Sequence, residues 1–508
     1  MHQVAKSKLK RYQKAQSHRE NFVEMFQDCY DYTLPMREGF YYEEAGQRRD
    51  DKIFDSTAVN GIQEFASRLQ SAMVPNFSRW ADFIAGSEVP PDQKDAVNNQ
   101  LDEVTNYVFE VLQNSNFAQE VHESFMDLAV GTGVLCVEEG DSVNPVVFTS
   151  VPLPRIVLDT GPNNNVDHIF RERKRVPFDE LSILYPDATF DPKVIANMGK
   201  DRETSVLEIV CKDYTKLNEE AYYHYAICMT TETLLYEKRL TGLGSNPFVC
   251  FRWSPAANEV YGRGPIVNAL PAIKVANLTV QLILENAQMA ISGIYQAEDD
   301  GVMNLDTINL VPGTVIPKAM GSAGLQPIQS AGRFDVGQLQ LNEMRMEIRK
   351  FLYMDMLGDP DKTPASATEV AERMADLNRR MSATFGRLQS ELIQPVLQRV
   401  VYILKKQGRI ELPTINGREV KVRSVSPLAQ GQANEDIARI ARFLETMNNY
   451  LGPQLLPVLI DPEQTAVVLA EKFGVPDTLI RDEEQRRQIT AMMQQMAQQQ
   501  GADVGSQG

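Results

Sequence analysis

The chain has 508 residues, 43% of them hydrophobic, which is enough for about three domain-sized units. Its formal net charge of −17 argues against a protein that grips nucleic acid through its phosphates. The five cysteines are scattered without a CxxC pair, which indicates reduced, mostly buried thiols rather than a disulfide framework or structural zinc. The N-terminus is polar, and no later stretch gives about 18 uncharged apolar residues, so we expect neither a signal peptide nor a membrane span.

The charge is uneven along the chain. Before the first acidic residue, Glu20, come six basic residues: Lys6, Lys8, Lys10, Arg11, Lys14 and Arg19. The sequence leaves open whether this run is a solvated helix face or a contact with DNA or an acidic partner.

The first 130 residues are predicted to be helical. We expect helices over 4–33, from an N-cap at Asp55 to Pro75, over 91–113 and over 116–130. The last should end at the turn Gly131-Thr132-Gly133. Short β-rich runs then continue to about residue 253, separated by Gly, Asn and Pro, so this part is mixed α+β.

A helix from 271 to 291 has an unusual pattern. Apart from Thr279 and Asn286, its surface is apolar except for a narrow polar stripe: Lys274, Asn277, Gln281, Glu285 and Gln288. Such a helix needs apolar neighbours on most sides. It is either a core helix with one solvent-exposed edge or a helix that packs against other subunits in a ring. Pro271 predicts a kink or a restart near its beginning.

The C-terminal half is predicted to be largely helical. A Gly/Pro-rich stretch reaches about Phe334, with strand candidates at 307–310 and 314–316, and a helix follows over 335–356. After a break comes a helix of about 40 residues, or roughly 60 Å, which Pro395 should kink. We then expect a β-like piece over 419–426, helices at about 430–450, 462–473 and 476–499, and a Gln-rich tail.

No motif for catalysis is present. The chain has no Walker phosphate loop, no GxSxG elbow and no HExxH, and its five histidines lie far apart in sequence. Acidic pairs such as Glu138-Glu139 and Asp299-Asp300 are typical of solvated surface, although carboxylates of this kind also build metal-dependent nucleases. We therefore expect no enzyme, no cofactor and no metal site.

Five short motifs occur in a fixed order over most of the chain. They are Phe54 to Ala58 leading into Leu69 to Pro75 with Trp80; Gly131 to Gly133; Tyr261 to Pro265; Ala367 to Val370 continuing to Arg387 to Leu392; and Pro427 to Ala429. In these motifs and their order the chain, from about residue 10 to about 485, resembles the head-to-tail connector, or portal, family of short-tailed double-stranded DNA phages.

The resemblance implies a predominantly helical α+β portal fold. Its parts would be a wing (1–262), a first stem helix (263–291), a clip (292–334), a second stem helix (335–356), a tunnel loop (357–366), a long kinked helix (367–407) and a crown with C-terminal helices (408–508). With this family in view, the ring is favoured over the monomeric core for the striped helix.

The resemblance also implies a function. Twelve copies would form a ring at one capsid vertex, assembled in the host cytoplasm with the major capsid and scaffolding proteins. Double-stranded DNA would pass through the ring during packaging and ejection, and the large terminase subunit and later a tail adaptor would dock on it. Twelve times −17 gives about −204, and such an acidic wall repels phosphates and suits a conduit.

Candidate site residues follow from this assignment. The channel would be lined by the polar stripe Lys274, Asn277, Gln281, Glu285 and Gln288, by Arg345 and Arg349 of the second stem helix, and by Lys362 of the tunnel loop. Lys362 is either a transient phosphate contact or a plain surface lysine. Partner docking on the clip is assigned to Asp306, Asn309 and Lys318. The alternatives are another virion structural protein, such as a tail adaptor or internal core protein, and a nuclease of the packaging machinery.

Overall fold

The structure is a computed structural model of the whole chain. It describes residues 2–41, 49–86, 89–162, 164–186, 188, 203–215, 219–292, 295–296, 319–321, 326–327, 334–354, 384–411, 420–424, 427–451, 460–461, 465–466 and 468–470. Within these residues the fold is mixed α+β and mostly helical, as the sequence predicts.

The N-terminal helices form as expected. They are α1 (His2–Thr33), α2 (Thr57–Met73), α3 (Pro91–Asn114) and α4 (Phe117–Val130). The predicted apolar face of α2 is buried, including Ile62 and Phe65. This helix begins two residues after the expected N-cap, because Asp55 lies outside it and accepts a hydrogen bond from the backbone N–H of Thr57 at 2.9 Å.

Two antiparallel sheets form the β-rich region. The first has the order β3-β2-β9, with β2 at Thr132–Glu139, β3 at Val146–Ser150 and β9 at Phe248–Arg252. The second has the order β4-β5-β6-β7-β8, with strands at Ile156–Thr160, Val166–Pro177, Glu203–Lys212, Ala221–Cys228 and Thr233–Thr241. Helices η1 (Leu153–Arg155) and α5 (Phe178–Leu184) connect strands in this region.

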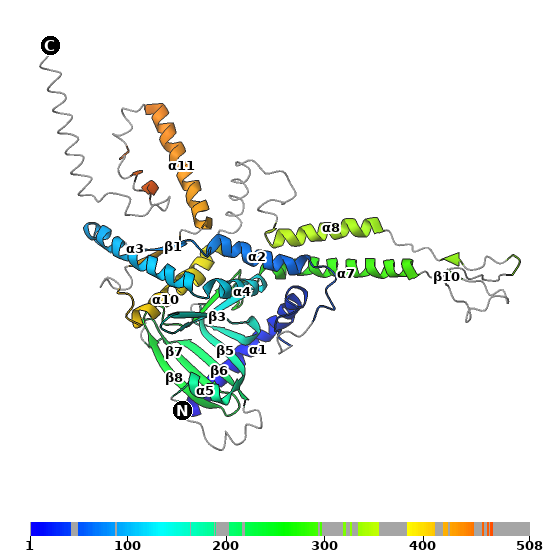
Figure 1. Cartoon of the computed structure of the whole chain (residues 1–508), viewed down its shortest axis with the longest axis horizontal. Helices are drawn as coiled ribbons and strands as arrows, with labels where there is room; N and C mark the ends of the chain where they lie inside the picture. The colour runs from blue at the N-terminus through cyan, green and yellow to red at the C-terminus, as the bar shows by residue number, and fades with distance from the viewer. Residues whose placement is uncertain are drawn as a thin grey trace, which may run out of the picture.

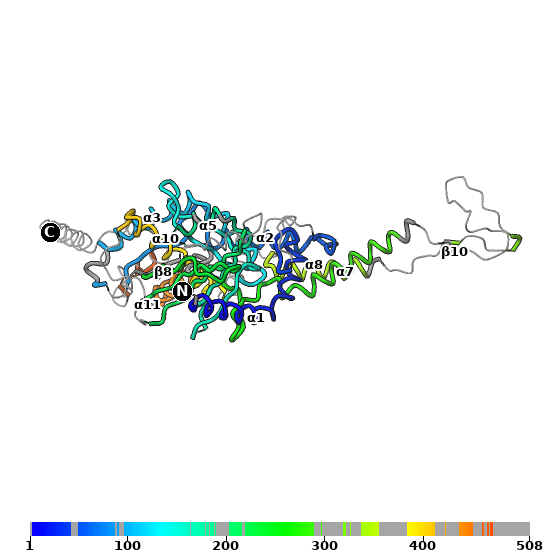
Figure 2. The backbone as a smooth tube through the Cα atoms, turned by 90° about the horizontal axis from the view of Figure 1, so that it is seen from below, coloured from blue at the N-terminus to red at the C-terminus, as the bar shows by residue number. Residues whose placement is uncertain are grey.

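Two helices project from this body side by side (Figure 1). They are α7 (Pro265–Ser292) and α8 (Phe334–Phe351), and we call them the helix pair. The view from below shows the same projection (Figure 2). Near its far end β10 (Tyr295–Gln296) pairs with β11 (Gln326–Pro327). The strand candidates at 307–310 and 314–316 lie outside the described residues.

Both helices of the pair differ in detail from the prediction. Helix α7 does not restart at Pro271 but runs through it. Because Pro271 is exposed, water can reach the carbonyl that its missing N–H leaves free. Helix α8 ends five residues early, and Tyr353, with φ of 58°, turns the chain out of the helical conformation.

The C-terminal elements return to the body. Residues 384–388 are helical, a π-helical turn (Gln389–Ile393) follows, and α10 (Gln394–Lys406) continues it. The helix is therefore irregular near Pro395, as predicted. Because Pro395 has no backbone N–H, it cannot donate a hydrogen bond to the preceding turn, and the π-turn lies there. Strand β12 (Val420–Ser424) pairs with β1 (Ala81–Ala85), and α11 (Pro427–Leu451) follows.

Most of the apolar side chains pack into one large core, which joins α1, α2, α4, the three-stranded sheet, the roots of α7 and α8, and α10. A smaller core lies between the first half of α1 and the five-stranded sheet. The cysteines are all free, and four of the five are buried. Burial raises the pKa of the Cys29 thiol to about 12, which keeps it protonated and unreactive.

Helix α7 is exceptional in composition. From Pro265 to Gln288 it is long and apolar enough to cross a membrane, although Lys274 and Glu285 lie within it. These two charged residues interrupt the helix, so it holds no run of about 18 uncharged apolar residues, and the expectation of no membrane span stays a prediction. Only 39% of the most apolar window is buried inside the subunit. The same composition arises in a helix that packs between protein neighbours.

A buried histidine makes the smaller core sensitive to acid. Burial and the nearby Arg11 lower the pKa of His168 to about 4. The unfolded chain takes up this proton near pH 6.5, so stability should fall as the pH drops from about 6.5 to 4, by about 3 kcal/mol in total. His168→Gln should remove this part of the pH dependence in urea unfolding, whereas His18→Gln, at an exposed site, should not. Equal pH profiles for His168→Gln and the wild type would contradict this.

Candidate functional site at the base of the helix pair

The two glycine motifs found in the sequence contact each other where α7 begins. The N–H of Gly264 donates to the carbonyl of Val130 at 2.9 Å, and the N–H of Gly262 donates to Thr132 Oγ1 at 3.0 Å. A Cβ atom on Gly131 would lie 2.2 Å from the carbonyl oxygen of Gly262. Only glycines allow this approach, and it fixes the start of α7 on the end of α4.

Tyr261 anchors the same motif in the core. Its side chain is buried against Phe22 and Phe26 of α1, and its hydroxyl accepts a hydrogen bond from the N–H of Leu158 at 3.0 Å. Burial raises the pKa of Tyr261 well above its ordinary value, so the hydroxyl stays neutral. The residue before the glycines thus ties α7 to α1 and to the five-stranded sheet.

A third motif reaches this region through the π-turn. Glu391 accepts a hydrogen bond at 2.7 Å from Nη2 of Arg252, the last residue of β9, and another at 2.9 Å from the backbone N–H of Arg252. Both side chains are largely buried. A π-turn places Glu391 differently from a regular helix, and here it directs the carboxylate to the strand that leads toward α7.

The motif that begins at Phe54 joins the helix pair to α2. Asn277 of α7 accepts hydrogen bonds from the N–H groups of Phe54 and Asp55 at 2.7 and 2.9 Å. The Asp55 carboxylate pairs with Arg345 of α8 at 2.7 Å. Burial alone would raise the pKa of Asp55, but the hydrogen bonds from Thr57 and the ion pair with Arg345 outweigh it and lower the pKa. Asp55 therefore stays ionised and holds three helices together.

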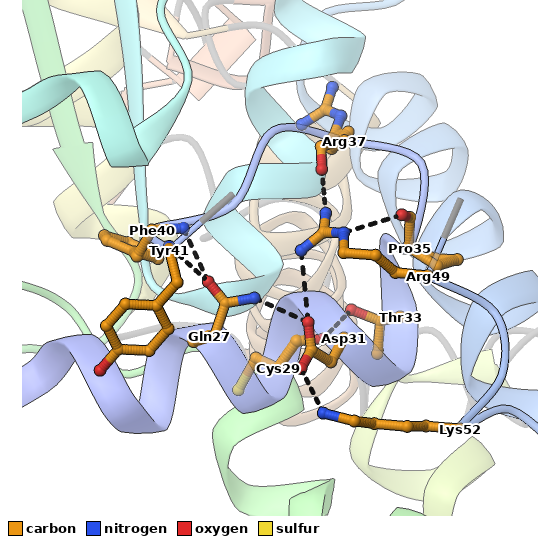
Figure 3. A network of polar contacts seen from close by, with 10 residues as sticks. All are labelled: Gln27, Cys29, Asp31, Thr33, Pro35, Arg37, Phe40, Tyr41, Arg49 and Lys52. Carbon is orange, nitrogen blue, oxygen red and sulfur yellow. Dashed lines mark hydrogen bonds and ion pairs between the residues drawn. The ribbon is translucent and has the colours of Figure 1, made fainter. Parts of the chain in front are cut away.

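A polar network holds the chain that leads to this motif (Figure 3). Asp31, near the end of α1, accepts hydrogen bonds from Gln27 at 2.6 Å, Arg49 at 3.3 Å and Lys52 at 2.9 Å. Arg49 also donates to the carbonyl of Pro35 at 3.2 Å. One turn earlier on α1, Asp28 pairs with Lys274 of α7 at 2.5 Å. The end of α1 thus binds both the connecting segment and α7.

The structure divides the predicted channel residues into two groups. Lys274, Asn277 and Arg345 lie together at the base of the helix pair, and all three are bound to residues of the same subunit. Farther out along α7, Gln281 donates to Glu285 at 2.9 Å and Gln288 is exposed. Arg349 lies one turn beyond Arg345 toward the body and is also exposed. The other predicted site residues lie outside the described residues: Lys362, Asp306, Asn309 and Lys318.

Sequence reasoning missed the partners of the first group. Asp28 and Asp55 come from distant segments, and nothing in the periodicity of α7 points to them. The motif that begins at Phe54 was the available signal, because it marked this segment as distinctive without giving its contacts.

Of the two acidic pairs that a nuclease could use, Glu138-Glu139 takes part in ion pairs. Glu139 pairs with Lys406, and Glu138 lies 3.8 Å from Arg173. Asp299 and Asp300 lie outside the described residues. Within the described part of the chain, no group of three or more His, Cys, Asp or Glu side chains is placed to hold a metal ion.

Known proteins resemble this chain over nearly its whole length. The family model described as "Bacteriophage head to tail connecting protein" matches residues 5–480. The probable portal protein of Bordetella phage BPP-1 is 23% identical, over 98% of this chain and 94% of that protein.

Two solved structures that resemble this one come from gene transfer agent particles. The neck of an empty particle, computed with C6 symmetry, gives a TM-score of 0.36 at 14% identity, covering 87% of this chain and 93% of that chain. The neck of a native particle, computed with C12 symmetry, gives 0.32 at 14% identity, covering 80% and 91%.

The extent of the family match decides the class of protein. The chain belongs to the bacteriophage head-to-tail connecting proteins. It is thus a structural protein of the virion, at the junction of head and tail, and its family has no enzymatic role. The contacts at the base of the helix pair consequently serve to hold α7 and α8 in place on the body of the subunit.

The glycine contact at this site can be tested by stability. Gly131→Ala places a methyl group against backbone that cannot move aside, so it should destabilise the protein by about 2 kcal/mol or more in urea unfolding. Gly386→Ala is the matched control, because this exposed helical glycine has no atom within 4 Å of an added Cβ. The control should be neutral or stabilising by up to about 1 kcal/mol. Similar values for both variants would show that the contact is not tight.

Proposed function

We propose that this protein is the portal subunit of a short-tailed double-stranded DNA phage. About twelve copies form a ring at one capsid vertex, through which the genome is packaged and later ejected. The family supports the place in the virion. The observation that most directly supports a ring is the distribution of exposed apolar side chains on the helix pair.

Helix α7 has an apolar side that its own subunit leaves uncovered. Its buried side is marked by Ala276 and by Ile283, which contacts α8. At about 100° per residue, the direction through Val275, Leu278 and Leu282 lies about 120° away from this side. Leu278 is 55% exposed and Leu282 is 49% exposed. Such a stripe favours a protein partner.

Helix α8 has a corresponding side that faces the other way. Leu341 and Ile348 are buried against the rest of the subunit. Leu339 and Met346 lie about 160° around the helix from them and are 74% and 61% exposed. The helix pair therefore offers one exposed apolar flank on each helix, while Leu284 of α7, which is 54% exposed, lies outside both.

Two different apolar flanks suit a ring better than a two-fold dimer. A dimer with two-fold symmetry covers one and the same patch on both copies, whereas a head-to-tail contact joins one flank to a different one and closes when the rotation fits. The α7 flank of one subunit would meet the α8 flank of the next. This arrangement would also bury the apolar surface of α7.

The polar side of the helix pair would then face the channel. In an antiparallel pair, the direction of Gln281, Glu285 and Gln288 on α7 and that of Arg349 on α8 point to the same side, between the two flanks. Lys274, Asn277 and Arg345 continue this side to the base, where they bind the subunit itself. In this assignment Gln281, Glu285, Gln288 and Arg349 contact DNA, and the three residues bound within the subunit brace the wall.

The remaining segments take the roles that the resemblance implies. Residues 1–262 form the wing, 263–291 and 335–356 the stem, 367–407 the long kinked helix and 408–508 the crown. The clip (292–334) docks the large terminase subunit and then the tail adaptor through Asp306, Asn309 and Lys318. The tunnel loop (357–366) meets passing DNA through Lys362, and the capsid and scaffolding proteins surround the ring during assembly.

Paired substitutions on α7 test the ring. Leu278→Asn with Leu282→Asn should leave a folded subunit that does not assemble, because the α7 flank loses its apolar surface. Gln281→Asn with Gln288→Asn places two asparagines on the polar side of the same helix and should leave assembly intact. Native mass spectrometry measures assembly, and circular dichroism confirms folding. Equal assembly of both variants would overturn the proposed interface.

A further inference from the structure

The structure separates the six N-terminal basic residues into two sets. Three have partners in the body of the subunit. Lys8 Nζ lies 3.1 Å from Cys211 Sγ and 4.7 Å from the centre of the Tyr225 ring, and Arg11 pairs with Asp159 at 3.0 Å. Arg19 donates to the backbone carbonyls of residues 154 and 156 at 3.0 and 2.8 Å. These three cations stabilise the packing of α1 on the five-stranded sheet.

The other three, Lys6, Lys10 and Lys14, point away from the body. They are exposed and recur every four residues, so they follow one ridge of α1 with steps of about 6 Å. Of the exposed residues between them, Ser7 and Gln13 carry no charge, and Arg11 is paired with Asp159. Throughout the described part of the chain, no ion pair reaches any of these lysines.

The helix cannot rotate to bring these lysines inward. Its opposite side is fixed, because Ala5, Tyr12 and Ala15 are buried in the smaller core and Tyr12 packs on Phe170 with ring centres 5.6 Å apart. Figure 2 shows α1 along one edge of the body. The three cations are therefore held at the surface of a chain whose net charge is −17.

We propose that Lys6, Lys10 and Lys14 form a lysine line that binds the phosphates of double-stranded DNA at the surface, outside the channel. Three ammonium groups along about 12 Å face several phosphates, because a duplex carries one charge per about 1.7 Å of its axis. The favourable free energy of binding comes from counterions that the DNA releases, and it needs no contact with the bases. The inference rests on the proposed function only for the identity of the polyanion.

The test uses covalently closed circular duplex DNA, which has no end that can enter a channel. Binding to the full-length protein is measured over a range of salt concentrations. The variant is Lys6→Gln with Lys10→Gln and Lys14→Gln. The control is Lys350→Gln with Lys405→Gln and Arg442→Gln, which removes the same charge from three separated, exposed positions. Native mass spectrometry of each protein reports assembly.

The lysine-line variant should bind the closed circle more weakly than the control does. The slope of log affinity against log salt should fall by about 1 for each lysine that contacts a phosphate, and so by up to about 3. Three outcomes would overturn the inference: no binding by the wild type at low salt, equal loss in variant and control, or loss of assembly in the lysine-line variant alone. The last would assign the line to a protein interface. Failure of the wild type to form a ring would instead contradict the proposed function.

Discussion

The direction of the helix pair depends on a contact between backbone and backbone. Where α4 ends and α7 begins, Gly131, Gly262 and Gly264 let the two segments approach until no side chain fits between them. Backbone contacts of this kind tolerate little adjustment, because neither partner has a flexible end that can move aside. The ion pairs of Asp55 and Glu391 then hold α8 and the π-turn around the same point. Motifs that are far apart in the sequence thus share one structural task.

This rigid base fixes the orientation of the exposed apolar flanks farther out on the helix pair. An apolar flank can select a partner only if its orientation is fixed, since a freely swinging helix would meet neighbours at many angles. The base supplies that orientation, and the two flanks leave the subunit with unsatisfied apolar surface on both sides. The proposed ring, in which each subunit covers the next, would resolve both constraints, and the acidic composition would keep DNA from adhering to its wall.

Much of the secondary structure could be predicted from the sequence. The periodicity of α2 and the turn at Gly131 placed these elements within one or two residues of their observed bounds. The fate of the polar stripe on α7 could not be predicted, because periodicity describes one helix and not its neighbours. Asn277 fits the stripe as well as Gln281 does, yet it is buried by the segment at Phe54 and Asp55. Long-range partners of this kind leave no local signal.

Prediction from the sequence has the same limit for the N-terminal basic residues. Composition identifies six cations, but only the packing of Tyr12 and Ala15 determines which of them turn inward. Likewise, Pro395 predicts an irregular helix, whereas the direction that Glu391 takes depends on the π-turn.

The central claim is that about twelve copies of this chain form a ring with an open channel. Native mass measurement of the purified protein, combined with electron microscopy class averages viewed down the particle axis, tests it directly. The account predicts a particle of about twelve times 57.1 kDa with a channel wide enough for a DNA duplex. A compact monomer or dimer at every protein concentration would contradict it.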